Sequence, residues 1–282
     1  MPKDERERAA VKLGALDLEA YLRDPSRKQQ FVTPMFDTIA PRYDAFTRLF
    51  SFGMDRRWKR AAIARIVALA QGSGGGRREA SARGEVGPRT PARMHAVDLA
   101  SGTGDFAVAI ARGLPDTTVT AIDASPRMIE EAHARLADPS RDRDVAERVR
   151  ATTGDMCAID LPTGSADVVT AGYGVRNVPE PAVAVREMAR VLRPGGTLVT
   201  LDFYRPAFAP WRRLLLWYLG AAGNAVGWWW HRDPVVYGYI ARSIDHFMSW
   251  QQFSALLEQE GFTVTRVTRY LGGGIALHEA TR

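Results

Sequence analysis

The residues best suited to chemistry form a glycine-containing segment near the middle of the chain. An apolar run ends at Val97-Asp98-Leu99, Gly102-Thr103-Gly104 follows, and helical apolar spacing begins at Asp105. The glycines therefore fall where a buried parallel strand turns into a helix. Without a Cβ, Gly102 and Gly104 can take positive φ and lie close to a ligand, which the free N–H groups of the next helix would face. The segment predicts a site for a nucleoside-bearing molecule.

Acidic residues at the same predicted rim restrict which nucleoside-bearing ligand can bind. Asp123 ends the second predicted strand, where a carboxylate can accept hydrogen bonds from both ribose hydroxyls. Asp155 and Met156 follow the third strand and suit the edge of an adenine, with a carboxylate for the amine and a backbone N–H for a ring nitrogen. Asp105 at the helix start disfavours a pyrophosphate, whereas a sulfonium cation tolerates nearby acids. These residues, with Asp98 and Gly172 on the same rim, favour S-adenosylmethionine.

The glycine segment alone leaves other ligands open. Gly102-x-Gly104-x-x-Ala107 also fits a loose dinucleotide fingerprint, with Asp123 about twenty residues further on. A tight turn without a ligand is a second alternative. Against a nicotinamide dehydrogenase, no lysine follows Lys59, so the core holds no Tyr-x-x-x-Lys pair.

Composition excludes several classes of site and partner. The chain has 282 residues, 46% of them hydrophobic, which predicts one domain with additions. The one cysteine, Cys157, excludes an intramolecular disulfide and a thiolate metal cluster, so we expect no metal site and a cytoplasmic protein. The net charge is +6, but the arginine-rich stretch Arg77–Arg93 has no interleaved aromatic residues, and we expect no nucleic-acid partner. A basic RNA-binding or non-catalytic assembly protein is the alternative from another class.

Strands and helices alternate through most of the chain, which predicts a parallel sheet covered by helices on both faces. Ligands then bind at the carboxyl ends of the strands. A helix around Trp250–Glu260 precedes two strands that should close the sheet as an antiparallel pair. The expected strands are His95–Leu99, Thr118–Ile122, Val149–Thr153, Asp167–Gly172, Thr197–Phe203, Thr263–Arg269 and Gly274–Ala280, and the intervening helices are Asp105–Gly113, Pro126–Ala137 and Pro181–Leu192.

Four segments lie outside this alternation. Residues 1–30 read as a loosely attached arm, and Phe31 to Ala70 as a helical N-terminal cap on a domain that spans 31–282. Residues 71–93 are rich in Gly and Arg and predict a flexible surface loop. Residues 205–242 are rich in tryptophan and predict a helical lid over an apolar substrate, with contact to a membrane surface left open. A membrane span is disfavoured because the apolar part is only about 17 residues long and contains glycines.

Several segments carry a family resemblance. Val97 to Asp105 resembles the first motif of class I methyltransferases, and other segments resemble, more narrowly, the ubiquinone/menaquinone C-methyltransferase family (UbiE/MenG-like). These are Phe36-Asp37-x-Ile39-Ala40-x-x-Tyr43-Asp44 with Ser51-x-Gly53 and Trp58, Gly172-Tyr173-Gly174-Val175-Arg176-Asn177-Val178, Arg190-Val191-Leu192-Arg193-Pro194-Gly195-Gly196, and Gly272-Gly273-Gly274-Ile275-Ala276-Leu277-His278.

The resemblance implies a Rossmann-like fold, a mostly parallel seven-stranded sheet with an antiparallel C-terminal strand. It implies that Thr103, Asp123, Asp155, Met156 and Gly172 line a pocket for S-adenosylmethionine. The acceptor would be a ring carbon of a prenylated quinol, demethylmenaquinol or a ubiquinol precursor, with another phenolic, lipid or natural-product scaffold as the alternative. A homodimer stays open, as does location at the inner face of the membrane.

Methylation of an aromatic carbon requires a base or a cationic stabiliser for the ring hydroxyl. Arg176 and Asn177 stand in the rim loop that the resemblance covers, and Tyr43 stands beside a helix break in the N-terminal cap. Because arginine stays protonated, we expect Arg176 to stabilise the phenolate, with Asn177 beside it and Tyr43 closing the other side of the pocket.

The sequence also departs from the family pattern. Phe46, Thr47 and Asp55 stand where Met, Asn and often His are expected. Asp202-Phe203-Tyr204 replaces the usual Glu and Ser after the last parallel strand. These departures bear on the identity of the acceptor more than on the chemistry.

Overall fold

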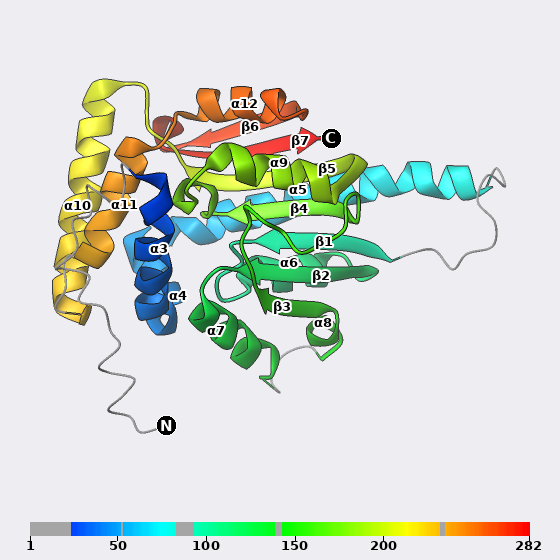
Figure 1. The fold of residues 1–282 in the computed structure, drawn as a ribbon, viewed down its shortest axis with the longest axis horizontal. Coiled ribbons are helices and arrows are strands. Elements are labelled where there is room, and N and C mark those ends of the chain that lie inside the picture. Colours follow the sequence, from blue (N-terminus) through cyan, green and yellow to red (C-terminus); the bar gives the residue numbers. More distant parts are fainter. Residues whose placement is uncertain (1–23, 52, 83–92, 139–142, 232–234) are drawn as a thin grey trace.

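Seven strands form one sheet in the order β3-β2-β1-β4-β5-β7-β6 (Figure 1). The computed structural model describes residues 24–51, 53–82, 93–138, 143–231 and 235–282. All neighbouring strands run parallel except β7, which lies antiparallel to both β5 and β6. The strands are β1 (Met94–Leu99), β2 (Thr117–Asp123), β3 (Val149–Thr153), β4 (Ala166–Gly172), β5 (Leu192–Phe203), β6 (Thr263–Tyr270) and β7 (Ile275–Thr281).

This topology confirms the predicted fold class, including the antiparallel C-terminal strand. The chain reverses its direction of progress across the sheet between β1 and β4, and ligands of open α/β sheets bind at such a point. The largest difference in a strand boundary is at β5, which begins at Leu192 rather than at Thr197, while the other strand ends differ from the expected ones by at most one residue. The additional residues pair with β4 through Leu192 opposite Ala166.

Helices cover both faces of the sheet. On one face, α9 and α12 bury residues such as Met188 and Phe253, and on the other α5 and α6 bury residues such as Ile66 and Ile110. Local sequence signals set several boundaries: α7 starts at Pro126, directly after Ser125, whose side chain accepts from the Met128 N–H. The helices are α6 (Asp105–Gly113), α7 (Pro126–Leu136), α8 (Arg143–Glu147), α9 (Pro181–Val191) and α12 (Trp250–Gln259).

A third hydrophobic cluster joins the N-terminal cap to the predicted lid. Phe31 and Met35 of the cap pack with Leu215, Leu219 and Tyr239 of the lid. Figure 1 shows most of the cap and lid helices at one end of the sheet, whereas the last helix of the cap runs along the sheet. They are α3 (Pro25–Ile39), α4 (Tyr43–Phe50) and α5 (Met54–Ala82) from the cap, and α10 (Ala209–His231) and α11 (Val235–His246) from the lid.

Two of the expected segment boundaries were wrong. The arm was expected to reach residue 30, but α3 begins at Pro25, and the Lys28 ammonium donates to the Arg176 carbonyl at 2.7 Å. The surface loop was expected from residue 71, but α5 continues to Ala82. A helix already anchored by Trp58, Ala62 and Ile66 extends without a new nucleation cost, which offsets the low helix propensity of the glycines. Residues 1–23 and 83–92 lie outside the described residues.

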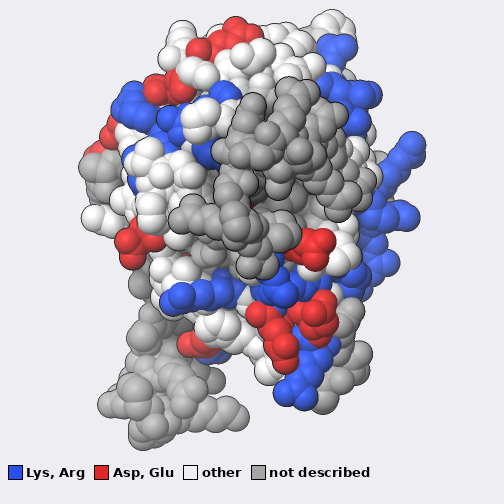
Figure 2. Space-filling model, turned by 90° about the vertical axis from the view of Figure 1, so that its right-hand side faces the viewer, with Lys and Arg blue, Asp and Glu red and all other residues white. Residues whose placement is uncertain are grey.

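The described helices contain no stretch long and apolar enough to cross a membrane. On the face drawn in Figure 2, Lys and Arg side chains are interspersed with Asp and Glu, and several lie along one edge. Whether nucleic acid binds stays a prediction.

Candidate active site

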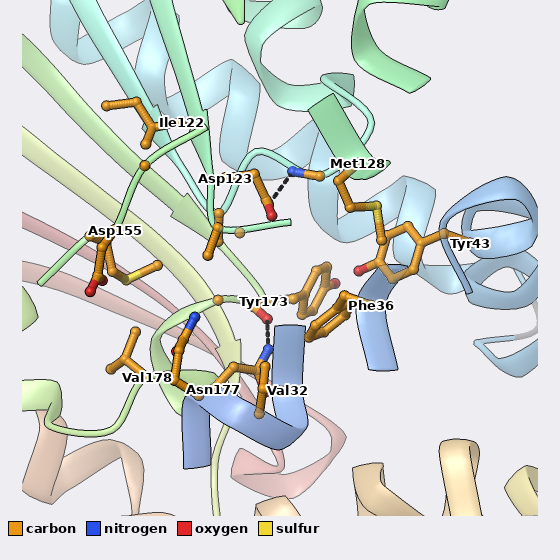
Figure 3. Close-up of a pocket in the computed structure, with 18 residues that line it drawn as sticks. Val32, Phe36, Tyr43, Ile122, Asp123, Met128, Asp155, Tyr173, Asn177 and Val178 are labelled. Atoms are coloured by element: carbon orange, nitrogen blue, oxygen red, sulfur yellow. Dashed lines mark hydrogen bonds between the residues drawn. The ribbon is translucent and has the colours of Figure 1, made fainter. Parts of the chain in front are cut away.

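A cavity of about 610 Å³ lies at the carboxyl ends of the parallel strands. Loops that follow β1, β2, β3 and β4 form its floor, and α3 and the start of α4 form its outer wall. Figure 3 shows Tyr43, Phe36 and Tyr173 gathered toward one end and Asp155 at the other. We call this space the donor cavity. Its wall includes Tyr43, Asn177 and five of the predicted cofactor residues: Gly102, Asp123, Asp155, Met156 and Gly172.

Asp123 holds the glycine loop against the end of β2. One carboxylate oxygen accepts from the Gly102 N–H at 2.8 Å and the other from the Ser125 N–H at 2.9 Å. Burial raises the pKa of Asp123, and these two donors act against that shift. Because each carboxylate oxygen has a further lone pair, the group can still accept from the hydroxyls of a ligand.

Asp155 fixes the loop after β3 in a similar way. Its carboxylate accepts from the Cys157 N–H at 2.8 Å, and Asp155 and Ala158 form an isolated bridge. The side chain of Met156 is buried beside it and contributes an apolar wall. A polar edge next to an apolar wall suits a flat heterocycle with an exocyclic amine.

The remaining predicted cofactor residues stand beside the donor cavity. Asp98 and Thr103 line a smaller adjoining cavity, and Gly104, at φ +83°, is the N-cap of α6. Asp98 is buried and accepts from the Thr170 hydroxyl at 2.7 Å, and burial raises its pKa to about 7. Asp98, Thr103 and Gly104 therefore stabilise the conformation of the glycine loop next to the donor cavity.

The role expected of Asp105 as a free acid at the helix start was wrong. Its carboxylate forms ion pairs with Lys59, at 3.2 Å, and with Arg135. Although burial acts to raise it, these cations hold the pKa of Asp105 below its ordinary value. Arg135 also pairs with Asp44, so the network ties α4 to the glycine loop. Since its charge is compensated, Asp105 does not discriminate between a sulfonium and a pyrophosphate.

The donor cavity fits S-adenosylmethionine. Carboxylates stand at two strand ends, and Ile122, Met128 and Val178 supply apolar surface between them, which suits the ribose and adenine of that ligand. The floor is backbone in close contact: a Cβ on Gly174 would lie 2.2 Å from the Ala100 Cβ. The loops after β1 and β4 can therefore approach each other this closely only because glycine stands at position 174.

A second cavity of about 630 Å³ adjoins the first, and we call it the acceptor cavity. Phe36, Tyr43 and Tyr173 line both cavities, so these three rings form the partition between them. The remaining wall comes from α3, α4, α5, α11 and the end of β5. Most of it is apolar, and the polar exceptions are Thr47, Ser51, Asp55 and Arg176.

Arg176 faces the acceptor cavity, but not as the free cation we expected. It is 5% exposed, and its guanidinium donates to the Asp202 carboxylate at 2.6 Å and to the Tyr173 carbonyl at 3.0 Å. The Arg176 backbone N–H donates to the other oxygen of Asp202 at 3.1 Å. The charge of Arg176 is thus matched by a fully buried carboxylate, and its stabilising effect on a phenolate is reduced accordingly.

Asn177 and Tyr43 have distinct positions. The Asn177 amide donates to the Tyr173 carbonyl at 3.1 Å and accepts from the Tyr239 hydroxyl at 3.0 Å, which links the rim loop to α11. Tyr173 has a φ of +60°, and the donors from Arg176 and Asn177 hold its carbonyl in that strained conformation. Burial raises the pKa of Tyr43 well above its ordinary value, so its hydroxyl is neutral and can donate a hydrogen bond to a ligand.

A model of the ubiE/COQ5 methyltransferase family matches residues 25–282. The chain belongs to the ubiE/COQ5 methyltransferase family. It is therefore a methyltransferase that uses S-adenosylmethionine. The catalytic and cofactor-binding roles of individual residues stay predictions.

Relatives match over nearly their whole length. The ubiquinone/menaquinone biosynthesis C-methyltransferase UbiE of Syntrophotalea carbinolica is 33% identical over 91% of this chain and 96% of its own. The demethylmenaquinone methyltransferase of Lactiplantibacillus plantarum is 29% identical over 89% and 95%.

Solved structures show the same fold at low identity. YcgJ from Bacillus subtilis has a TM-score of 0.51 at 16% identity, covering 79% of this chain and 98% of its own. The geranyl diphosphate C-methyltransferase of Streptomyces coelicolor, solved with S-adenosyl-L-homocysteine, has a TM-score of 0.50 at 12% identity, covering 69% and 74%.

Sequence analysis missed several residues of this ubiE/COQ5 family site. Asp202 was noted as a departure, but not as the partner of Arg176. The rule that ligands meet the carboxyl ends of strands could have found it, because Asp202 ends β5 next to β4. Tyr173 stood within a recognised motif and Asp55 among the departures, but neither was assigned a role, and the Lys28 contact depends on how the cap packs against the rim loop.

The pairing of Arg176 with Asp202 can be tested by unfolding. Arg176→Met should lower the free energy of unfolding by about 3–5 kcal/mol, because it leaves Asp202 buried without a partner. The double variant Arg176→Met/Asp202→Asn should recover part of that loss, as measured by urea denaturation followed by circular dichroism. If the losses of the single variants simply add, the two side chains are not coupled.

Proposed function

We propose that this methyltransferase methylates a ring carbon of a prenylated quinol, demethylmenaquinol or a ubiquinol precursor, in respiratory quinone biosynthesis. The observation that carries the proposal is the acceptor cavity, an apolar space with few polar groups that adjoins the donor cavity. The names of the relatives point to the same class of acceptor. Another phenolic, lipid or natural-product scaffold is the alternative acceptor, which the departures at Asp55 and Asp202–Tyr204 keep open.

The chain's contribution to the donor side is binding and orientation. S-Adenosylmethionine supplies, when bound, an electrophilic methyl group on a sulfonium. In this proposal Asp123 accepts from the ribose, and Asp155 with Met156 holds the adenine. Gly102 and Gly172 let backbone lie against the ligand, while Asp98, Thr103 and Gly104 keep the loop in shape.

On the acceptor side, the aromatic partition sets the approach of the quinol ring. Phe36 and Tyr43 have ring centroids 6.2 Å apart, and Tyr173 and Phe203 have centroids 5.5 Å apart. Phe36, Tyr43 and Tyr173 line both cavities and present aromatic faces between them. Methyl transfer needs the ring carbon, methyl and sulfur in line, so this positioning supplies much of the acceleration.

Three residues complete the proposed catalytic set. Tyr43 donates a hydrogen bond at the junction of the two cavities. Arg176 adds a positive potential on the acceptor side, reduced by Asp202, and its Nε is buried without a partner among the described residues. Asn177 acts as a positioning residue because it holds the Tyr173 carbonyl and the Tyr239 hydroxyl.

Cofactor binding tests the donor side. Asp123→Ala should weaken the binding of S-adenosylmethionine by about 10-fold or more, because it removes charge-assisted hydrogen bonds. Isothermal titration calorimetry measures this, with Asp116→Ala, an exposed acid before β2, as the matched control. Equal affinity in wild type and Asp123→Ala would contradict the assignment, and no binding by wild-type protein would contradict the enzyme itself.

Acceptor choice tests the proposed substrate. With S-adenosylmethionine saturating, kcat/KM should be highest for a demethylmenaquinol or ubiquinol-precursor analogue within a panel of phenolic acceptors. Mass spectrometry identifies the methylated product. Preferential methylation of a non-quinol phenol would favour the alternative scaffold.

We also propose that α10 contacts the membrane that dissolves the acceptor's prenyl tail. Phe208 is 68% exposed, Leu214 54% and Trp217 70%, and Arg213 stands exposed beside them. Figure 1 shows α10 at the outer edge of the molecule, away from the sheet. Exposed aromatic and aliphatic side chains next to arginine are suited to an interface with anionic lipids.

Vesicle binding tests this contact. Trp217→Ser/Leu214→Ser should reduce co-sedimentation with phosphatidylglycerol/phosphatidylcholine vesicles several-fold, because the buried apolar area falls. Arg143→Ser, on the separate helix α8, is the control and should leave binding unchanged. Unchanged binding by the double variant would remove α10 from the interface.

A further inference from the structure

We propose that Asp55 is the general base of the reaction and accepts the proton of the acceptor's ring hydroxyl. The inference rests on the proposed function, because it assigns a proton acceptor to that acceptor cavity. It differs from the expectation that Arg176 governs the ionisation of the ring.

Asp55 lies in the wall of the acceptor cavity at the start of α5. It is 6% exposed, and its Oδ1 accepts from the Ser51 hydroxyl at 2.8 Å. Among the described residues, no Lys or Arg nitrogen lies within 4.0 Å of its carboxylate. An acid is common in the first turn of a helix, but such acids are normally exposed to solvent. Here the second carboxylate oxygen is available to a ligand.

The other groups that face the cavity cannot take a proton. Burial raises the pKa of Tyr43, Tyr173 and Tyr239, so all three hydroxyls stay protonated. Arg176 is cationic and paired with Asp202. The side chains of Thr47 and Ser51 end in neutral hydroxyls. Asp55 is thus the one carboxylate in the described wall of the acceptor cavity.

Tyr173 supplies an independent sign that a polar group binds there. Its hydroxyl is buried and has no hydrogen-bond partner among the described residues, although its ring lines the cavity. Asp55 and Tyr173 both line this cavity, and burial together with the charge of Asp55 raises the pKa of the Tyr173 hydroxyl. A ligand hydroxyl that donates to Asp55 and accepts from Tyr173 would satisfy both.

The O–H bond of the ring hydroxyl breaks and its proton passes to the Asp55 carboxylate, while the electron pair moves into the ring. The ring carbon forms a bond to the methyl group as the methyl–sulfur bond breaks, which gives a neutral thioether and a ring carbonyl. The proton on the methylated carbon then leaves to water, and the oxygen recovers a proton from Asp55. The net release is one proton per turnover.

A binding measurement tests the contact without turnover. With S-adenosylhomocysteine saturating, wild-type protein should bind naphthol about 10-fold more tightly than its methyl ether, which cannot donate a hydrogen bond to the carboxylate. In Asp55→Asn that ratio should fall to about 3 or less, because a charge-assisted bond becomes neutral. Asp116→Asn is the control and should keep the wild-type ratio. An unchanged ratio in Asp55→Asn overturns the inference.

Kinetics separate a base from a structural residue. The loss of kcat in Asp55→Asn should shrink as the acceptor's hydroxyl becomes more acidic, because a more acidic hydroxyl needs less help from a base. Asp55→His should recover part of the turnover, because a neutral imidazole at the same position can also accept the proton. A loss of kcat that is the same for all acceptors contradicts the base role. The binding and turnover results can also differ. If wild-type protein methylates no quinol, but its preference for naphthol over the methyl ether is still reduced in Asp55→Asn, the proposed function fails and the contact between Asp55 and the ring hydroxyl stands.

Discussion

The site depends on the buried ion pair between Arg176 and Asp202. Desolvating two charges is costly, and the cost is offset here by geometry, since Asp202 accepts from both the side chain and the backbone of Arg176. The pair joins the loop after β4 to the carboxyl end of β5. It thereby fixes Tyr173 at a positive φ, and the Tyr173 ring becomes the partition between two cavities. A neutral pair of the same shape would not hold both strand ends so strongly.

The cap and the lid are organised around this loop. Lys28 of α3 donates to the Arg176 carbonyl, and Tyr239 of α11 donates to Asn177. On the other side, Arg135 connects α4 to the glycine loop through Asp44 and Asp105. The helices outside the sheet are therefore attached to it by polar contacts at the rim, while Phe31, Leu219 and their neighbours seal the surface above. The result is a largely apolar space at the switch point of the sheet.

Most of the sheet and of the donor cavity followed from the sequence. The β-strand periodicity, the glycines before α6 and the acids at Asp123 and Asp155 are local signals, and the strand-end rule converts them into one rim. The acceptor side did not follow, because its wall is assembled from α3, α4, α5 and α11, whose packing no local pattern states. Arg176 and Asp105 were expected to act as free charges. Each is instead paired with a residue far away in sequence, which only the tertiary fold reveals. The part of α5 that contains Gly74–Gly76 was not predicted, because the glycine-rich composition was given more weight than the packed helical turns that precede it.

The central claim is that the two adjoining cavities deliver a methyl group to a ring carbon. The most direct measurement is carbon-13 NMR of the product formed by wild-type protein from methyl-labelled S-adenosylmethionine and a demethylated prenyl quinol. The account predicts label in a methyl group bound to ring carbon. Label in a methoxy group, or no transfer to the quinol, would contradict it.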